Sequence, residues 1–204
     1  MEFPRDITAC EQTSQVYVAG WQQSTIYIWK VSVDGSDIKQ WLSLPDSFRL
    51  SPLTTLSVTS SRLLVTSNKE LIQFDATGSE LRHVYVHKLI HAVESPAEIL
   101  IVVYNTQMKQ NQVCIVNAAG QVVKVARKQG GSLVSLNTIP HIAVDSKGNV
   151  IVADCENRRI LLLDSQLVYR HIILNESQLK YEQPERLCYL EQSRQLLVLS
   201  LIHI

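Results

Sequence analysis

The sequence contains few of the residues that mark a metal site, a cofactor site or a membrane segment. Its 204 residues include four cysteines, at positions 10, 114, 155 and 188, and none of them forms a C-x-x-C pair. A zinc knuckle is therefore not indicated, and we expect reduced thiols. The longest clean apolar run, 99–104, is far shorter than the ~18 residues that indicate a membrane span. Glycine-rich phosphate loops, serine nucleophile elbows and H-E-x-x-H motifs are also absent from the sequence.

The chain also has no excess of either charge, because 19 basic residues balance 19 acidic ones. Nothing in this balance directs the protein to DNA, to RNA or to an acidic membrane. Hydrophobic residues make up 46% of the chain, which is enough for a sizeable core. No apolar segment follows Met1–Asp6, so a signal peptide is not indicated and we expect a cytoplasmic protein without a membrane or DNA partner.

One stretch, Pro140 to Leu163, shows most clearly what the sequence does contain. Three short apolar runs, 142–144, 150–153 and 160–163, are separated by two turns. The first turn, 145–149, is rich in Asp, Gly and Asn, which favour tight turns because glycine tolerates positive φ and Asp and Asn bond nearby backbone. Short runs between tight turns predict an antiparallel meander rather than helices.

This stretch resembles the NHL repeat, which forms one blade of a β-propeller. The residues that carry the resemblance are Pro140, Ala143-Val144-Asp145, Gly148-Asn149, Ala153-Asp154, Asn157, Arg158-Arg159 and Ile160. Arg158 departs from the pattern, where the family often has histidine. The resemblance implies an all-β propeller.

Weaker copies of the same pattern cover nearly the whole chain. They open at Pro4, Pro52, Ile90, Pro140 and Pro184, at intervals close to the ~40–45 residues of a four-stranded blade. We therefore predict a single NHL-like propeller domain over residues 1–204. The expected blades are 4–43, 52–87, 90–128 and 140–174, with a half blade at 184–204.

The half blade leads to a further expectation about the edges of the sheets. Four complete blades and two inner strands predict an incomplete ring, which is either part of a longer propeller or a divergent or truncated gene product. Unclosed strand edges can pair with other chains, so self-association through these edges is expected.

The residues just after each blade opening are expected to line one mouth of the central channel. The candidate binding residues there are Arg5, Asp6, His91, His141, Glu185 and Arg186. His91 and His141 hold the same repeat position in successive blades and are the weak candidates for metal ligands. Because a zinc site needs a third ligand and none is evident, no metal and no cofactor are predicted. The alternative role for both histidines is a hydrogen bond to local backbone.

The remaining candidates lie in predicted loops. Trp21 is expected in a loop and is a candidate for protein contact. Arg158 and Arg159, with Lys147 and Arg170, form a candidate RNA-binding patch, although a solvated face is the favoured interpretation. Four aspartates, Asp75, Asp145, Asp154 and Asp164, are interpreted as turn-capping residues and not as a catalytic carboxylate pair.

Taken together, these features favour a non-enzymatic scaffold whose loops and channel mouth bind a partner protein. NHL propellers often form the substrate-recognising end of tripartite-motif ubiquitin ligases, so the resemblance implies that role as one context. Two alternatives stay open. One is an RNA-binding NHL propeller, and the other is a metal-dependent enzyme of lyase or hydrolase type with its site at the channel mouth, as in the peptide-amidating lyase that NHL repeats resemble.

Overall fold

The computed structural model describes residues 3–22, 25–44, 54–67, 69–105, 110–134, 136, 140–180 and 182–201. Over these residues the secondary structure consists of β-strands and turns, without a helix. It follows that no helix in the described parts is long and apolar enough to cross a membrane. The chain divides into two compact units, Met1–Ala92 and Val93–Ile204.

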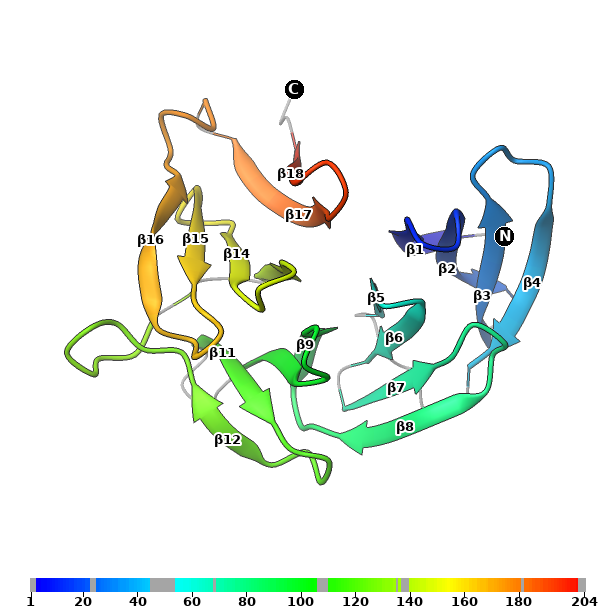
Figure 1. Ribbon diagram of the computed structural model, residues 1–204, viewed down its shortest axis with the longest axis horizontal. Helices are drawn as coiled ribbons and strands as arrows, with labels where there is room; N and C mark the ends of the chain where they lie inside the picture. Colours follow the sequence, from blue (N-terminus) through cyan, green and yellow to red (C-terminus); the bar gives the residue numbers. More distant parts are fainter. Residues whose placement is uncertain are drawn as a thin grey trace. The chain divides into compact units, whose positions relative to one another are not determined.

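The first unit contains two four-stranded antiparallel sheets in which the strands follow chain order (Figure 1). The first sheet consists of β1 (Phe3–Cys10), β2 (Gln15–Gln22), β3 (Thr25–Ser32) and β4 (Ile38–Ser43). The second consists of β5 (Thr55–Thr59), β6 (Arg62–Thr66), β7 (Glu70–Phe74) and β8 (Glu80–Tyr85). Both sheets are the meanders that the short apolar runs and tight turns predicted.

The third sheet begins on the boundary between the units, which falls within β9 (Leu89–Glu94). It continues with β10 (Leu100–Asn105), β11 (Asn111–Val116) and β12 (Val122–Val125). The fourth sheet consists of β13 (His141–Val144), β14 (Val150–Asp154), β15 (Arg159–Leu163) and β16 (Tyr169–Leu174). A fifth sheet has two described strands, β17 (Gln183–Leu190) and β18 (Gln195–Leu201), as predicted for the half blade.

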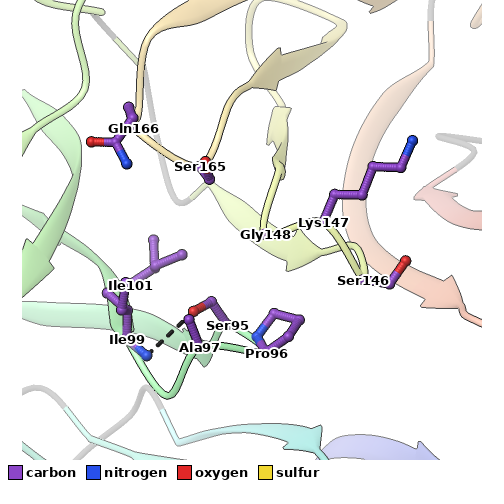
Figure 2. Close-up of a pocket in the computed structure, with 10 residues that line it drawn as sticks. All are labelled: Ser95, Pro96, Ala97, Ile99, Ile101, Ser146, Lys147, Gly148, Ser165 and Gln166. Atoms are coloured by element: carbon purple, nitrogen blue, oxygen red, sulfur yellow. Dashed lines mark hydrogen bonds between the residues drawn. The ribbon is translucent and has the colours of Figure 1, made fainter.

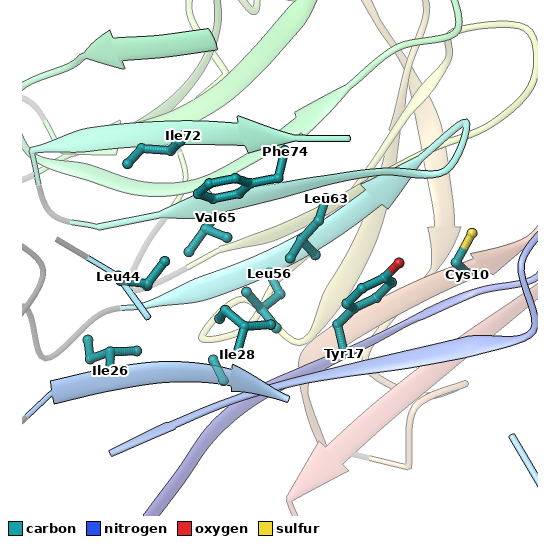
Figure 3. Packing of buried hydrophobic residues seen from close by; sticks show 11 residues of the cluster. Cys10, Tyr17, Ile26, Ile28, Leu44, Leu56, Leu63, Val65, Ile72 and Phe74 are labelled. Carbon is teal, nitrogen blue, oxygen red and sulfur yellow. The ribbon is translucent and has the colours of Figure 1, made fainter. Parts of the chain in front are cut away.

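Burial follows from the position of each strand in its sheet. Strands β6, β7, β10, β11 and β14 lie inside their sheets and are apolar along most of their length, whereas the outer strands β4, β8, β12 and β16 are largely exposed. In the first unit a cluster of buried side chains lies between the two sheets, with Tyr17, Ile28, Leu56 and Phe74 among its members (Figure 3). This packing of sheet against sheet accounts for the continuous apolar runs of the inner strands.

One strand extends further than the sequence predicted. Trp21, expected in a loop, lies in β2, where its Cα pairs with Phe3 of β1 and with Ile26 of β3. The prediction was wrong because the β2–β3 ladder continues beyond Gly20 as far as the pair formed by Gln22 and Thr25. Backbone pairing on both sides holds this segment extended, although a glycine usually weakens a strand.

The turns show the chemistry that the sequence predicted for three of the four aspartates. Asp75 Oδ1 accepts hydrogen bonds from the backbone N–H groups of Thr77 and Ser79, at 2.8 and 2.9 Å. Asp145 and Asp164 accept equivalent bonds from residues two and four positions later. All four cysteines are free in the structure.

Candidate functional site at the strand entrances

The predicted mouth residues lie where inner strands begin, and they are divided between the two units. The first unit contains Arg5, Asp6 and His91, and the second contains His141, Glu185 and Arg186. Arg5 is exposed, Asp6, His91 and His141 are buried, and Glu185 and Arg186 are half-buried. In the second unit, therefore, an acidic residue (Glu185) and a basic residue (Arg186) of the predicted mouth are both partly accessible.

Several of these strand-entrance side chains bond the backbone of the next inner strand. The contacts are Asp6 Oδ2 with Leu56 N at 2.8 Å, Thr55 Oγ1 with Ile90 O at 3.5 Å, and His141 Nδ1 with Leu187 N at 3.2 Å. Ser57 Oγ adds a bond to Ala92 O at 2.8 Å. These bonds satisfy backbone groups on strand edges that have no ladder partner on that side. Asp6 and His141 therefore hold neighbouring blades together within their units.

The bond to Leu187 also determines what the His141 ring can do. Nδ1 accepts the backbone N–H, so in the neutral ring the proton resides on Nε2. A metal needs a nitrogen lone pair, and in this state neither nitrogen of His141 offers one. In this state the Nε2–H group is the donor of the ring, and the ring does not ligate an ion.

A β-bulge directs the acidic residue at the start of β17. Pro184 pairs with Ser200 and Arg186 pairs with Leu199, so Glu185 is the extra residue without a partner on β18. Strand β1 has the same irregularity at Arg5. Bulges re-aim side chains and are frequent beside active sites.

Cys155 lies against this bulge but does not have the character of a nucleophile. Its Sγ is 3.7 Å from Gln183 Oε1. Burial raises the pKa of the Cys155 thiol, and the nearby negative charges of Glu185, Glu156 and Asp154 raise it further. A raised pKa keeps the protonated thiol at neutral pH, whereas the nucleophilic form is the thiolate.

Asp154 differs from the turn-capping residue that the sequence predicted. Its side chain is fully buried, and the amide of Asn157 donates to both carboxylate oxygens, at 3.0 and 2.9 Å. Arg159 Nε donates to Oδ2 at 2.7 Å. This network joins three residues of the repeat pattern at the β14–β15 turn. It also occupies the Asp154 carboxylate, which is therefore a structural group and not a general base.

The predicted RNA patch is largely paired with carboxylates. The ion pairs are Arg158 with Glu176 at 2.5 Å, Arg159 with Asp154 at 2.7 Å, and Arg170 with Asp164 at 2.6 Å. Phosphate binding depends on cations that can neutralise the backbone of a nucleic acid. These pairs reduce the charge that the patch offers, which agrees with the expectation of a solvated face.

The described residues do not gather a conventional metal-ligand set. Among them, no cluster of three or more His, Cys, Asp or Glu side chains is placed to hold an ion. Zinc requires about four ligands and calcium about six to eight oxygens. The described residues therefore do not fit a resident metal, and the function proposed below uses no metal step.

A separate hollow of about 300 Å³ lies in the second unit, at the other ends of the strands (Figure 2). Three turns line it: β9–β10, β13–β14 and β15–β16. Sequence reasoning missed it because the sequence identifies the turns but not which of them lie close together. Lys147, a candidate for the RNA patch, lies on its rim.

The chain resembles solved β-propeller structures. No protein-family model matches it, and no curated protein matches it in sequence. One similar structure is regucalcin, a calcium-binding protein from Agrobacterium tumefaciens strain C58, with 13% identity and a TM-score of 0.58, covering 92% of this chain and 64% of regucalcin. A glucose dehydrogenase shares 9% identity with a TM-score of 0.66, covering 95% of this chain and 76% of the enzyme. A luciferin-regenerating enzyme shares 11% identity with a TM-score of 0.60, covering 96% and 68%.

These likenesses establish an all-β propeller fold and correct the functional prediction. Two of the three similar propellers are named as enzymes and the third as a calcium-binding protein. The expectation of a non-enzymatic scaffold rested on the fold, and the fold leads instead to proteins of these kinds, so that expectation is wrong. At such low identity the likeness carries the fold and no particular activity.

Proposed function

We propose that this chain belongs to a propeller enzyme that binds a small anionic substrate at the strand-entrance edge of the second unit. The reaction is of the hydrolase or lyase type, in which a carbonyl or carboxylate oxygen gains negative charge. The observation that carries the proposal is the Glu185 bulge, which lies on the strand that His141 holds by its backbone, two residues after Gln183, whose side chain contacts Cys155. The enzyme neighbours of the same fold support an enzymatic role.

Arg186, His141 and Glu185 would have distinct roles. Arg186, half-buried next to the bulge, would bind the anionic group of the substrate, since guanidinium donors match carboxylate geometry. The Nε2–H of His141 would donate to the oxygen on which charge develops. Glu185 would act as the general base, because the Asp154 carboxylate is already bonded to Asn157 and Arg159 and Glu156 lies in the exposed β14–β15 turn rather than in the bulge.

The experiment is a turnover screen of the purified chain with esters, lactones and uronate-containing sugars. Esters and lactones report hydrolysis, and the uronate-containing sugars report β-elimination. For any substrate that turns over, Glu185→Gln is expected to lower kcat by about 10²–10⁴-fold, the usual contribution of a general base. Arg186→Gln is expected to raise KM more than it lowers kcat.

The controls lie at the opposite end of the same strand, in the exposed β17–β18 turn. Glu191→Gln and Arg194→Gln make the same charge changes there and are expected to leave turnover unchanged. A folded chain that turns over nothing in the screen refutes the proposal. Equal effects of Glu185→Gln and Glu191→Gln also refute it.

We infer in addition that the blades are of the NHL kind, within one propeller domain over 1–204. Beside the sequence pattern, a set of contacts supports this inference: Asn157 and Arg159 of the repeat pattern both donate to the buried carboxylate of Asp154. A structure-based alignment of this blade with solved NHL blades tests the inference. It requires the same carboxylate–amide–guanidinium contacts at the same turn.

A further inference from the structure

The hollow at the turns of the second unit has two chemically different walls. Apolar side chains from the β9–β10 turn and β10 form one wall, and polar or cationic side chains from the β13–β14 and β15–β16 turns form the other (Figure 2). The apolar wall consists of Pro96, Ala97, Ile99 and Ile101. The polar wall contains Ser146, Lys147, Ser165 and Gln166. A pocket divided in this way fits a molecule with an apolar body and a polar or charged end.

The turns that form the hollow are fixed by their own side chains. Asp145 Oδ1 accepts the N–H of Lys147 at 2.9 Å, and Asp164 Oδ1 accepts the N–H of Gln166 at 2.9 Å. On the apolar side, Ile99 N donates to Ser95 Oγ at 3.2 Å. Turns locked by such bonds lose little further entropy when a ligand binds.

The polar wall supplies hydrogen-bond donors and positive charge. Lys147 is exposed on the rim, and the lining residues include no Asp or Glu. Lys124 Nζ donates to Gln166 Oε1 at 2.6 Å, which orients the Gln166 amide and brings a second ammonium group near the polar wall. The Asp164 carboxylate is paired with Arg170 at 2.6 Å. Among the lining side chains of this wall, Lys147 therefore carries the charge, and Glu98, exposed in the β9–β10 turn, is not part of the lining.

The arrangement favours a carboxylate over a phosphate. Phosphate sites usually use clusters of free backbone N–H groups. Here the N–H groups of residues 147, 149, 166 and 168 already donate to Asp145 or Asp164. One rim ammonium, neighbouring hydroxyls and an apolar wall suit a monoanion joined to a hydrocarbon chain.

We propose that this hollow is a binding site for a small carboxylate with an apolar body, such as a short-chain aliphatic acid. Its volume of about 300 Å³ is at the lower end of the ~300–1,000 Å³ of small-molecule sites. The lining contains no His, Cys, Asp or Glu, and the role proposed for the hollow is binding. It lies at the opposite strand ends from the proposed catalytic edge and does not depend on that proposal.

The test is an NMR titration of the ¹⁵N-labelled full chain with hexanoate and, as the matched neutral probe, hexanamide. Hexanoate is expected to shift the amide signals of residues 95–101, 146–148 and 165–166, and to bind about tenfold more tightly than hexanamide, the equivalent of 1.4 kcal/mol. Equal binding of the two probes, or shifts spread over the whole chain, would overturn the proposal.

Two variants separate the polar wall from the apolar wall. Lys147→Gln is expected to weaken hexanoate binding about tenfold and to leave hexanamide binding unchanged, whereas Lys128→Gln, an exposed lysine outside the lining, changes neither. Ile99→Asp places a negative charge on the apolar wall at a side chain that is already 38% exposed, and is expected to abolish hexanoate binding in a folded chain. Hexanoate binding that survives both Lys147→Gln and Ile99→Asp contradicts the proposed site.

Discussion

Two adjacent arginines at the β14–β15 turn should differ sharply in their contribution to stability. Arg159 Nε lies 2.7 Å from Oδ2 of Asp154, whose side chain is fully buried, while the Arg159 side chain is 33% exposed. Arg158 pairs at 2.5 Å with Glu176, and both of these side chains are more than a third exposed. The two substitutions to alanine therefore compare a buried carboxylate partner with a solvated one.

The magnitudes follow from the burial of each partner. Arg159→Ala removes a bond to a charged group, about 1.5–3 kcal/mol, and leaves Asp154 buried with fewer compensating donors. Removing one partner of a fully buried pair costs about 3–5 kcal/mol, but Arg159 is partly exposed, so we expect about 2–3 kcal/mol. Arg158→Ala should cost about 0–1 kcal/mol, as for exposed pairs. The positive φ of 47° at this position does not add to the cost of Arg158→Ala, because arginine and alanine bear the same backbone strain there.

The assay is urea unfolding of each variant. The free energies of unfolding are compared between variants whose slope of free energy against urea concentration is the same as that of the native chain. A double-mutant cycle gives the cause: in an Asp154→Asn background, Arg159→Ala should cost at least about 1 kcal/mol less than in the native chain. Equal costs for Arg158→Ala and Arg159→Ala, within about 0.5 kcal/mol, would refute the reasoning, since additivity errors are of that size.

Three further outcomes are expected. His83→Ala should lower the free energy of unfolding by about 1–3 kcal/mol, measured by urea unfolding, because Glu70 is buried and its Oε2 lies 2.6 Å from His83 Nε2. The hydroxyl of Ser32 and further hydrogen bonds from its turn lower the pKa of Asp34 from 3.8 to about 2, so carboxyl NMR should show that Ser32→Ala moves this pKa back toward 3.8. Because the pKa of Asp34 is depressed in the folded state, the stabilisation by Asp34 is present above about pH 3.8 and is lost as the pH falls through about 2. Burial raises the pKa of Cys114 to about 12, so iodoacetamide at neutral pH should leave Cys114 unmodified in the native chain and should alkylate it in urea.

The sequence predicted the sheets well because the turns have strong local chemistry. Asp75 and Asp145 begin turns of the same kind, each closed by bonds from the aspartate to backbone N–H groups two and four residues later. Such bonds are local, so a single sequence is enough to recognise them. Trp21 was misplaced for a related reason: the glycine before it resembles a strand end, and only cross-strand pairing with Phe3 and Ile26 keeps the segment extended.

Contacts between turns were beyond what the sequence could predict. Asp154 has the same turn-forming character as Asp145, yet its side chain is fully buried and bonded to Arg159, and the sequence pattern predicts neither the burial nor the bond. The hollow beside Lys147 likewise depends on which turns of two neighbouring sheets meet. Periodicity gives the face on which a side chain lies, but it does not give the neighbour that the next sheet supplies.

The strand-entrance residues show why a repeated polar position is ambiguous evidence for a binding site. The inner strand of each blade has one edge without a ladder partner, and its N–H and C=O groups need partners from elsewhere. Asp6 supplies an acceptor to Leu56 and His141 supplies one to Leu187, each across to the next inner strand of the same unit. An aspartate and a histidine thus meet the same backbone requirement, so a polar residue just after a blade opening follows from blade packing without any ligand. Evidence for a site has to come from groups that this requirement does not use, and at this edge Glu185, displaced by the bulge from the β17–β18 ladder, is such a group.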